Sequence, residues 1–401
     1  MIRSVVVTGA GVVAAHGSGL PAFREALARG PLPLSDVPTE DGFHPPEDAP
    51  RAALVPPDVT KRWIEPLIAR RMCLPSRLAV SAAIQATSEA GLAEPGDHVP
   101  DGDATAVCLG TAWGSISYTL RLLRQIEEAG PGSISPFLFT ETVANAPAGQ
   151  VAIRLGARGP NLTLTQREAS GTAALVRGAA LVASGRARRV LAGATDEISP
   201  ILHSVLTRYG SLTRGDRARP FAADRDGFVV AEGAAVFLLE TEEDAADRGA
   251  TPLVRIVAWG RGNDPTASAT DWGRGATGLA RRVATELARA DVPIDTIGRV
   301  VSGASGSRRG DELEARTAHA LFDGSPPPVL APKGLTGEYG GGFLASALGS
   351  LDDEVASPSV GAADPDLPVA PATGPLPPAR RVLVTCTASA GPFAWLVLER
   401  P

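Results

Sequence analysis

The order of apolar runs along this chain constrains its fold more than any other feature of the sequence. In the first part, short runs suited to buried strands alternate with alanine-rich stretches suited to helices, such as residues 78–90 and 172–184. Strands that alternate with helices favour a sheet whose faces are covered by helices. The runs predicted as strands in this part are residues 5–8, 105–111, 162–166, 190–194 and 235–240.

The second part of the chain repeats this alternation. Helices are expected around residues 277–290 and 311–322, and the change from one half to the other is placed near Ala250. The sequence therefore predicts an α/β architecture of two fused βαβ-type halves, residues 1–250 and residues 251–401. The runs predicted as strands in the second half are residues 253–259, 300–303, 329–331, 381–387 and 394–399.

Composition and charge exclude several classes of protein. Hydrophobic residues make up 44% of the 401 residues and charged residues 20%, which is ordinary for a globular chain. The formal net charge is -6 and the arginines are dispersed, so nucleic acid is not an expected partner. No apolar run has the length of a membrane span and the first residues lack a signal-peptide pattern, so we expect a cytoplasmic chain without a membrane partner. Two proline-rich stretches, residues 30–57 and 358–378, are expected to be surface excursions.

Neither a metal ion nor a cofactor is predicted. Cys73, Cys108 and Cys386 stand far apart without paired metal-ligand spacing, and we expect them to be reduced and buried. Glycines within residues 9–11 would fit a dinucleotide-binding turn, but the acidic residue expected after a second strand is missing. The five histidines lie outside the motifs described below, and each is expected to be a surface or structural histidine.

Several longer motifs are more specific than these patterns. Residues 219–234 read RPFAADRDGFVVAEGA, and residues 164–174 read LTQREASGTAA. Together with residues 148–150, 158–161 and 191–197, they closely resemble the hallmark segments of the β-ketoacyl synthases. The chain is identified by this resemblance as a member of that family. The resemblance implies the thiolase-like fold, in which two fused halves form a layered α-β-α-β-α architecture.

The same resemblance predicts that the catalytic groups of the family are missing. Its condensing enzymes use a cysteine thiolate that accepts the acyl group and two histidines that assist decarboxylation of malonyl carrier protein. Glu168 stands in the place of the cysteine, and Gly303 and Glu338 stand in the places of the histidines, whereas Lys333 keeps the family lysine. A carboxylate forms no useful thioester and glycine has no side-chain proton. We therefore predict no catalytic residue and a chain that is inactive alone, within a 3-oxoacyl-[acyl-carrier-protein] synthase complex.

Residues 387–393 align with the glycine-rich gating loop of the family. There the loop carries phenylalanines and a backbone donor for an oxyanion, whereas here it reads TASAGPF. This change puts both gating and the backbone donor in question. For Glu168 we predict a structural role, in which its carboxylate pairs with Lys333 or with an arginine and fills the unused pocket.

Loss of every catalytic group on an intact scaffold resembles the chain length factors, the ketosynthase β subunits of type II polyketide synthases. Thr336 and Gly337 after Lys333 also agree with their motif, although they usually carry glutamine at position 168. The resemblance implies a heterodimer with an active ketosynthase α subunit, paired through an edge strand of each first half. It further implies contact with acyl carrier protein through the complex, and a shared tunnel that holds the growing acyl or polyketide chain.

Two alternatives stay open. Relatives with glutamine at position 168 are proposed to decarboxylate malonyl carrier protein and supply starter units, but an ionised Glu168 would repel both malonate and the enolate. The chain could instead be a purely structural stabiliser of the active subunit. A condensing enzyme with Glu168 as its nucleophile would lack both bases, and the sequence does not fix the product type or chain length.

Control of chain length is expected on the helix that follows the second predicted strand. Helical spacing places Ile116, Thr119 and Leu123 on one face, and these resemble the positions that gate the tunnel in chain length factors. Trp113 and Tyr118 add bulk, which would suit a shorter or narrower chain if they point inward. The alternative for each of these residues is ordinary core packing.

Overall fold

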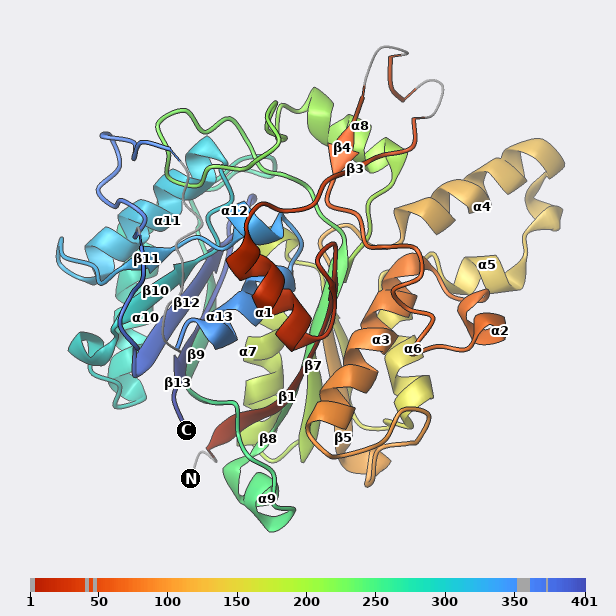
Figure 1. The fold of residues 1–401 in the computed structure, drawn as a ribbon, viewed down its shortest axis with the longest axis horizontal. Helices are drawn as coiled ribbons and strands as arrows, with labels where there is room; N and C mark the ends of the chain where they lie inside the picture. Colours follow the sequence, from red (N-terminus) through yellow and green to blue (C-terminus); the bar gives the residue numbers. More distant parts are fainter. Residues whose placement is uncertain (1–3, 40–42, 46–48, 352–360, 373) are drawn as a thin grey trace.

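The computed structural model describes residues 4–39, 43–45, 49–351, 361–372 and 374–401 (Figure 1). Within these residues the strands form one mixed sheet of eleven strands and a separate ribbon of two short strands. The order in the large sheet is β11-β10-β12-β13-β9-β1-β8-β7-β5-β6, and β2 (Gly17–Ser18) pairs with β1.

The large sheet contains two sets of strands with the same connectivity. In each set the second strand along the chain runs parallel to the third and the fourth, and the fifth strand lies antiparallel between the fourth and the first. The sets meet where residues 5–7 pair antiparallel with residues 254–256. The first set is β1 (Val5–Ala14), β5 (Thr105–Gly110), β6 (Asn161–Leu164), β7 (Arg189–Asp196) and β8 (Gly233–Thr241). The second set is β9 (Val254–Asn263), β10 (Arg299–Ser302), β11 (Val329–Leu330), β12 (Arg381–Thr387) and β13 (Pro392–Glu399).

Burial explains why these segments are strands. Every residue of β1, β5, β7 and β8 is buried, and apolar residues predominate in their sequences, with charged residues only near the strand ends. Strands buried on both faces need apolar runs rather than an alternation of apolar and polar residues. The predicted strand positions in both halves are confirmed, whereas the division at residue 250 stays a prediction.

Helices and strands stack in five layers (Figure 1). α3 (Leu74–Glu89) and α6 (Ala146–Leu155) cover the outer side of the first set, and α10 (Ala276–Arg289) and α11 (Arg308–Leu321) cover the second. Between the two sets lie α7 (Ser170–Ala183) and α13 (Gly342–Gly349), which contact strands of both. This is the layered α-β-α-β-α architecture that was predicted.

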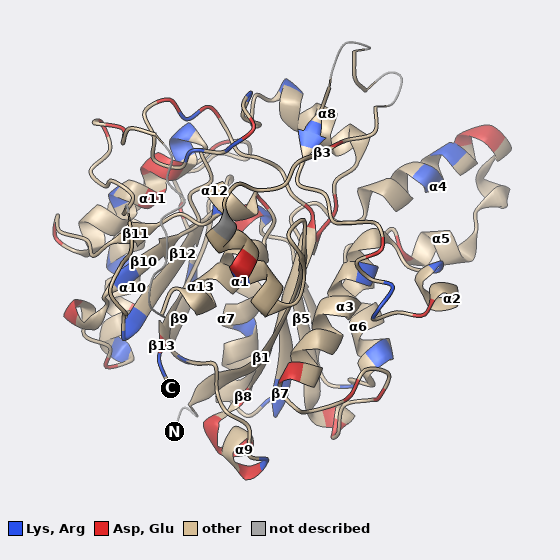
Figure 2. Cartoon of the chain, in the orientation of Figure 1, with Lys and Arg blue, Asp and Glu red and all other residues tan. Residues whose placement is uncertain are grey.

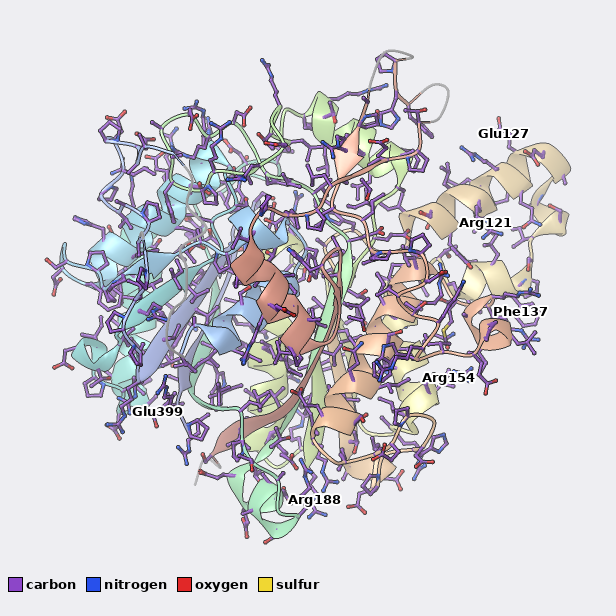
Figure 3. All side chains as sticks on the ribbon, viewed as in Figure 1. Arg121, Glu127, Phe137, Arg154, Arg188 and Glu399 are labelled. Carbon is purple, nitrogen blue, oxygen red and sulfur yellow. The ribbon has the colours of Figure 1, made fainter. Side chains whose placement is uncertain are left out.

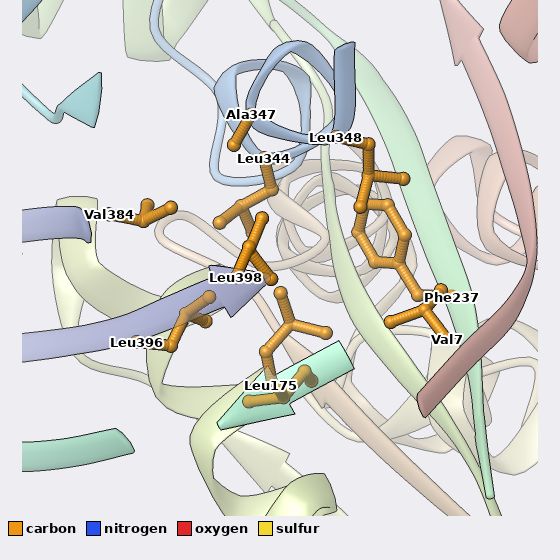
Figure 4. A pocket seen from close by; sticks show the side chains of 10 residues that line it. Val7, Leu175, Phe237, Leu344, Ala347, Leu348, Val384, Leu396 and Leu398 are labelled. Carbon is orange, nitrogen blue, oxygen red and sulfur yellow. The ribbon is translucent and has the colours of Figure 1, made fainter. Parts of the chain in front are cut away.

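The central position of α7 depends on small residues. A Cβ atom at Gly171 would lie only 2.2 Å from the carbonyl oxygen of Gly340, so no larger residue fits there without displacing the backbone. A small apolar cavity of about 10 Å³ remains between α7, α13 and the strands (Figure 4). A water molecule there would find no polar side chain, so the space is a packing gap. Its lining includes Leu175, Leu344, Leu348, Val7, Phe237 and Val384.

The remaining helices connect and flank these layers. They are α1 (Leu20–Arg29), α2 (Pro66–Ala69), α4 (Ile116–Ala129), α5 (Pro136–Thr140), α8 (Pro200–Arg208), α9 (Glu242–Asp247) and α12 (Lys333–Thr336). Figure 2 shows acidic and basic residues on the outer helices α4, α9, α10 and α11. In the described part of the chain, no helix combines the length and the apolar character that crossing a bilayer requires.

The proline-rich stretches are more than surface excursions, which corrects the prediction. In the first stretch, β3 (Ser35–Asp36) pairs with β4 (Arg51–Ala52), and Val37 packs into an apolar cluster with residues of α8. In the second, Val369 is buried against the outer side of the second set. Single apolar side chains between prolines anchor these segments, although the segments show no periodicity. Residues 40–42, 46–48, 358–360 and 373 lie outside the described part.

Candidate functional site

The site lies where α7 begins. A short 3-10 turn, Arg167–Ala169, leads into the helix, and Arg167 adopts a positive φ of 50°. The hydroxyl of Ser170 accepts a hydrogen bond from the backbone N–H of Gln166 at 2.8 Å, which fixes this turn. Glu168 is thereby held just before the amino terminus of a buried helix, where the helix dipole favours a negative charge.

The carboxylate of Glu168 is bonded by the loop between β12 and β13. The backbone N–H of Ser389 donates to it at 3.1 Å, and the Ser389 hydroxyl lies 3.2 Å from both of its oxygens. The guanidinium of Arg167 donates instead to the hydroxyl of Ser389 at 3.3 Å and to the backbone oxygen of Ala269 at 3.1 Å. Among the described residues, no hydrogen bond or ion pair joins Glu168 to Lys333 or to an arginine, so the predicted pairing was wrong. Ser389 belongs to the loop that aligns with the gating loop of the family, so a backbone donor of this loop is already bonded to a carboxylate of the same chain.

Lys333 pairs with Glu338 instead. Its ammonium donates to both carboxylate oxygens, at 2.8 and 2.9 Å, and the two side chains are 0% and 3% exposed. Burial raises the pKa of Glu338 to about 7. The loss of solvation and the proximity of Glu168 both raise this pKa, and together they outweigh the lowering effect of Lys333. Burial alone would lower the pKa of Lys333, but the carboxylate of Glu338 bonded to it holds that pKa above its ordinary value.

The position of Gly303 is closed by Cys386. A Cβ atom at residue 303 would lie 2.8 Å from the Cys386 Sγ and 3.0 Å from its Cα, so a histidine would need this neighbour to move. The Cys386 thiol donates to the backbone oxygen of Glu168 at 3.2 Å and lies 4.0 Å from the Lys333 Nζ. Burial raises the pKa of this thiol to about 12, so it stays protonated. All three cysteines are buried and unpaired, as predicted.

Glu314 supports this arrangement from α11. Its carboxylate accepts hydrogen bonds from Ser302 at 2.9 Å, and from the Thr385 hydroxyl and the Thr387 N–H at 2.6 Å each. These bonds tie the end of β10 to β12, beside residues 303 and 386. Sequence reasoning missed Glu314, Ser389 and the role of Cys386. The one available signal was that predicted strands 300–303 and 381–387 could be neighbours in a parallel sheet.

Comparisons with known proteins show the family of the chain. The profile of the family described as "Beta-ketoacyl synthase, N-terminal domain" matches residues 2–245. The chain belongs to the beta-ketoacyl synthase family. It is 28% identical over 366 residues to 3-oxoacyl-[acyl-carrier-protein] synthase 2 of Vibrio cholerae serotype O1, which covers 87% of this chain and 84% of the relative. It is 30% identical over 382 residues to the actinorhodin polyketide beta-ketoacyl synthase 2 of Streptomyces coelicolor, which covers 89% and 88%.

A solved structure gives the same result for the fold. The ishigamide ketosynthase/chain length factor superposes with a TM-score of 0.87 at 26% identity, and the match covers 100% of both chains. The thiolase-like ketosynthase fold predicted from the motifs is therefore confirmed. This beta-ketoacyl synthase family member thus has relatives both among 3-oxoacyl-[acyl-carrier-protein] synthases and among polyketide synthase proteins.

The residues predicted to line a tunnel lie on and before α4, but they do not form one buried wall within this subunit. Trp113 and Ile116 are half-buried and pack against an apolar cluster formed with α8. The hydroxyl of Tyr118 donates to the backbone oxygen of Met72 at 3.0 Å, and that of Thr119 donates to Ser115 at 2.8 Å. Leu123 is 56% exposed. Their role in a tunnel stays a prediction.

Proposed function

We propose that the chain is a non-condensing ketosynthase-like subunit, a chain length factor, that pairs with an active ketosynthase α subunit. The observation that carries the proposal is the closed packing of the three positions aligned with the family's catalytic groups. Glu168 is bonded by Ser389, Glu338 is bonded by Lys333, and Gly303 is covered by Cys386. Side chains engaged in this way are unable to accept an acyl group or to move a proton during decarboxylation.

An unpaired sheet edge supports a partner subunit. β6 is the last strand at one edge of the large sheet, and within the described residues its outer side has no strand partner. Such an edge is a ready template for a strand of another chain. Apolar side chains that a partner could cover are exposed on α6, which contacts β6, and on α4, α5 and the turn between α5 and α6; Figure 3 shows Phe137 at the periphery of the molecule. These side chains are Leu123, Phe137, Phe139, Val143 and Ile153.

The relatives also fit the proposal. The similarity to the ishigamide ketosynthase/chain length factor covers the whole chain, and the actinorhodin relative is a polyketide synthase protein. In the proposed complex the partner supplies the catalytic cysteine and histidines and receives acyl carrier protein. This chain supplies part of the tunnel wall through α4 and thereby limits the length of the acyl or polyketide product.

Co-expression with an active ketosynthase α subunit tests the proposal. We expect a one-to-one complex by size and mass analysis, with chain extension only when both subunits are present and the partner keeps its cysteine. Each subunit alone and the complex with a Cys→Ala partner serve as controls. A homodimer of this chain that decarboxylates or extends malonyl carrier protein by itself would overturn the proposal.

Two further variants separate the alternatives. Glu168→Gln supplies the neutral amide found in decarboxylating relatives, but it restores neither base at positions 303 and 338. We therefore expect no gain of malonyl decarboxylation, and a clear gain would favour the starter-supplying role. Ile116→Ala on the inner side of α4 is expected to change product length. A change in yield at constant length would instead favour a purely structural stabiliser.

A further inference from the structure

The start of α4 has no cap of its own. Its N-cap residue, Ser115, makes no side-chain hydrogen bond to the first turn, and Leu122 is the one residue of the helix that is buried. The first N–H groups of a helix need acceptors, and most helices find them in a local Ser, Thr, Asp or Asn. Both the capping and the placement of α4 therefore depend on groups from elsewhere in the chain.

Two buried carboxylates, at and just after the end of β7, hold the segment that leads into α4, and one of them accepts from the first turn of the helix. Asp196 accepts hydrogen bonds from the Thr111 hydroxyl and the Ala112 N–H at 2.8 Å each, and from the Trp113 N–H at 3.2 Å. Glu197 accepts from the N–H of Ser117, in the first turn of α4, at 2.8 Å. The entry segment of α4, residues 111–117, is thus held at both of its ends, by the last residue of β7 and by the residue that follows it.

These carboxylates are costly to bury, which argues that they are there for the bonds they make. Asp196 is 0% exposed and Glu197 is 2% exposed. Burial raises the pKa of Glu197 to about 6, although the bonds from Ser117 and the nearby charge of Arg77 lower it. Glu232 lies beside Glu197 and accepts from the Ile198 N–H at 3.2 Å, so the residues after β7 are themselves fixed.

Comparison with α3 shows why the position of α4 depends on this anchoring. The start of α3 is also capped by a distant carboxylate, since Glu141 accepts from the Cys73 N–H at 2.9 Å and the Ser76 hydroxyl at 2.7 Å. However, α3 is buried along most of its length, so packing fixes its place. α4 lacks such packing, and loss of its anchor would let its first turn shift relative to the sheet.

We propose that Glu197, together with Asp196, is a positioning residue that sets the placement of α4 and through it the length of the product chain. This inference rests on the proposed function, in which the inner face of α4 forms part of the tunnel wall. Glu197 touches no substrate in this role; it acts through Ser117 and so through Ile116 and Thr119. The residue is therefore a determinant of specificity rather than of turnover.

The test compares Glu197→Ala, Glu197→Gln and Glu197→Asp in the complex with an active ketosynthase α subunit. Alanine removes the acceptor, aspartate withdraws it by one methylene group, and glutamine keeps a neutral oxygen in place. We expect the ratio of the main product to its neighbouring lengths to change about five-fold for alanine, the factor that corresponds to one lost helix cap. Aspartate should change the ratio in the same direction, and glutamine should restore it.

A matched control and a direct measurement keep the test decisive. Thr241→Ala removes the cap of α9, where the hydroxyl accepts from the Asp244 N–H at 3.0 Å, and should lower stability without changing the ratio. Hydrogen exchange in the first turn of α4 should become faster in Glu197→Ala and Glu197→Asp. Unchanged ratios and exchange in both variants, while Ile116→Ala still changes the ratio, would overturn this inference alone. Unchanged ratios in Ile116→Ala as well would overturn the proposed function with it.

Discussion

Replacing Lys333 with methionine is expected to destabilise the folded chain severely. Methionine keeps most of the length of the side chain but removes the cation, so Glu338 loses both of its hydrogen bonds, at 2.8 and 2.9 Å. Among the described residues no other side chain donates to this carboxylate, and nearby Glu168 raises the cost of its charge. Breaking a buried pair on one side costs about 3–5 kcal/mol. Full burial of both side chains places this variant at the upper end of that range.

The cost should also depend on pH. Burial holds the pKa of Glu338 at about 7 in the folded chain, above its ordinary value of 4.5, so the folded state binds this proton more tightly than the unfolded state. Stability from this group is therefore gained as pH falls through 7 and lost as pH rises. Without Lys333 the pKa of Glu338 rises further. Each pH unit above 7 should then lower the free energy of unfolding of the variant by up to about 1.4 kcal/mol, a loss that the wild type does not share.

Urea denaturation at pH 7 and pH 8 measures both effects. The control is the double variant Lys333→Met/Glu338→Leu, which replaces the whole pair by apolar groups. Such replacements are often close to neutral, so the double variant should recover most of the lost stability. The reasoning fails if the single variant costs less than about 1 kcal/mol, or if the double variant is no more stable than the single one.

Three further predictions concern the closed site and α4. Gly303→Ala should cost about 1–3 kcal/mol by overpacking, and adding Cys386→Gly should reduce that cost in denaturation experiments. Ser389→Ala should lower the midpoint of thermal unfolding, because the carboxylate before α7 loses its hydroxyl donor and about 1–3 kcal/mol; full retention of the midpoint would contradict this. Trp113→Ala or Leu123→Ala should lengthen the product in the complex, and unchanged length with an intact complex would remove these residues from the tunnel wall.

The strands and helices could be predicted because burial determines them locally. The run at residues 235–240 lies within β8 (Gly233–Thr241), and residues 277–290 differ from α10 (Ala276–Arg289) by one residue at each end. Continuous apolar runs and helical periodicity hold the information for such elements within a short segment. Positions where single apolar side chains anchor proline-rich segments, such as Val37, carry no such periodic signal.

The contacts of the site could not be predicted because they join distant segments. Glu168 and Ser389 are 221 residues apart in the chain, and their contact depends on how the loop after β12 meets the start of α7. Lys333 pairs with Glu338 rather than with Glu168 because of local geometry that the sequence did not show. Gly337 turns the chain with a positive φ of 70°, which brings Glu338 back onto the ammonium.

The three altered positions form one packed unit rather than three independent losses. A histidine at position 303 would collide with Cys386, and a histidine at position 338 would leave the buried ammonium of Lys333 without its two bonds. A cysteine at position 168 would leave the Ser389 donors without their carboxylate. Each reversion alone therefore destabilises the groups that the other positions have adapted to. Such mutual dependence is what we expect of a subunit whose partner supplies the chemistry, since its own site is then constrained by packing and not by catalysis.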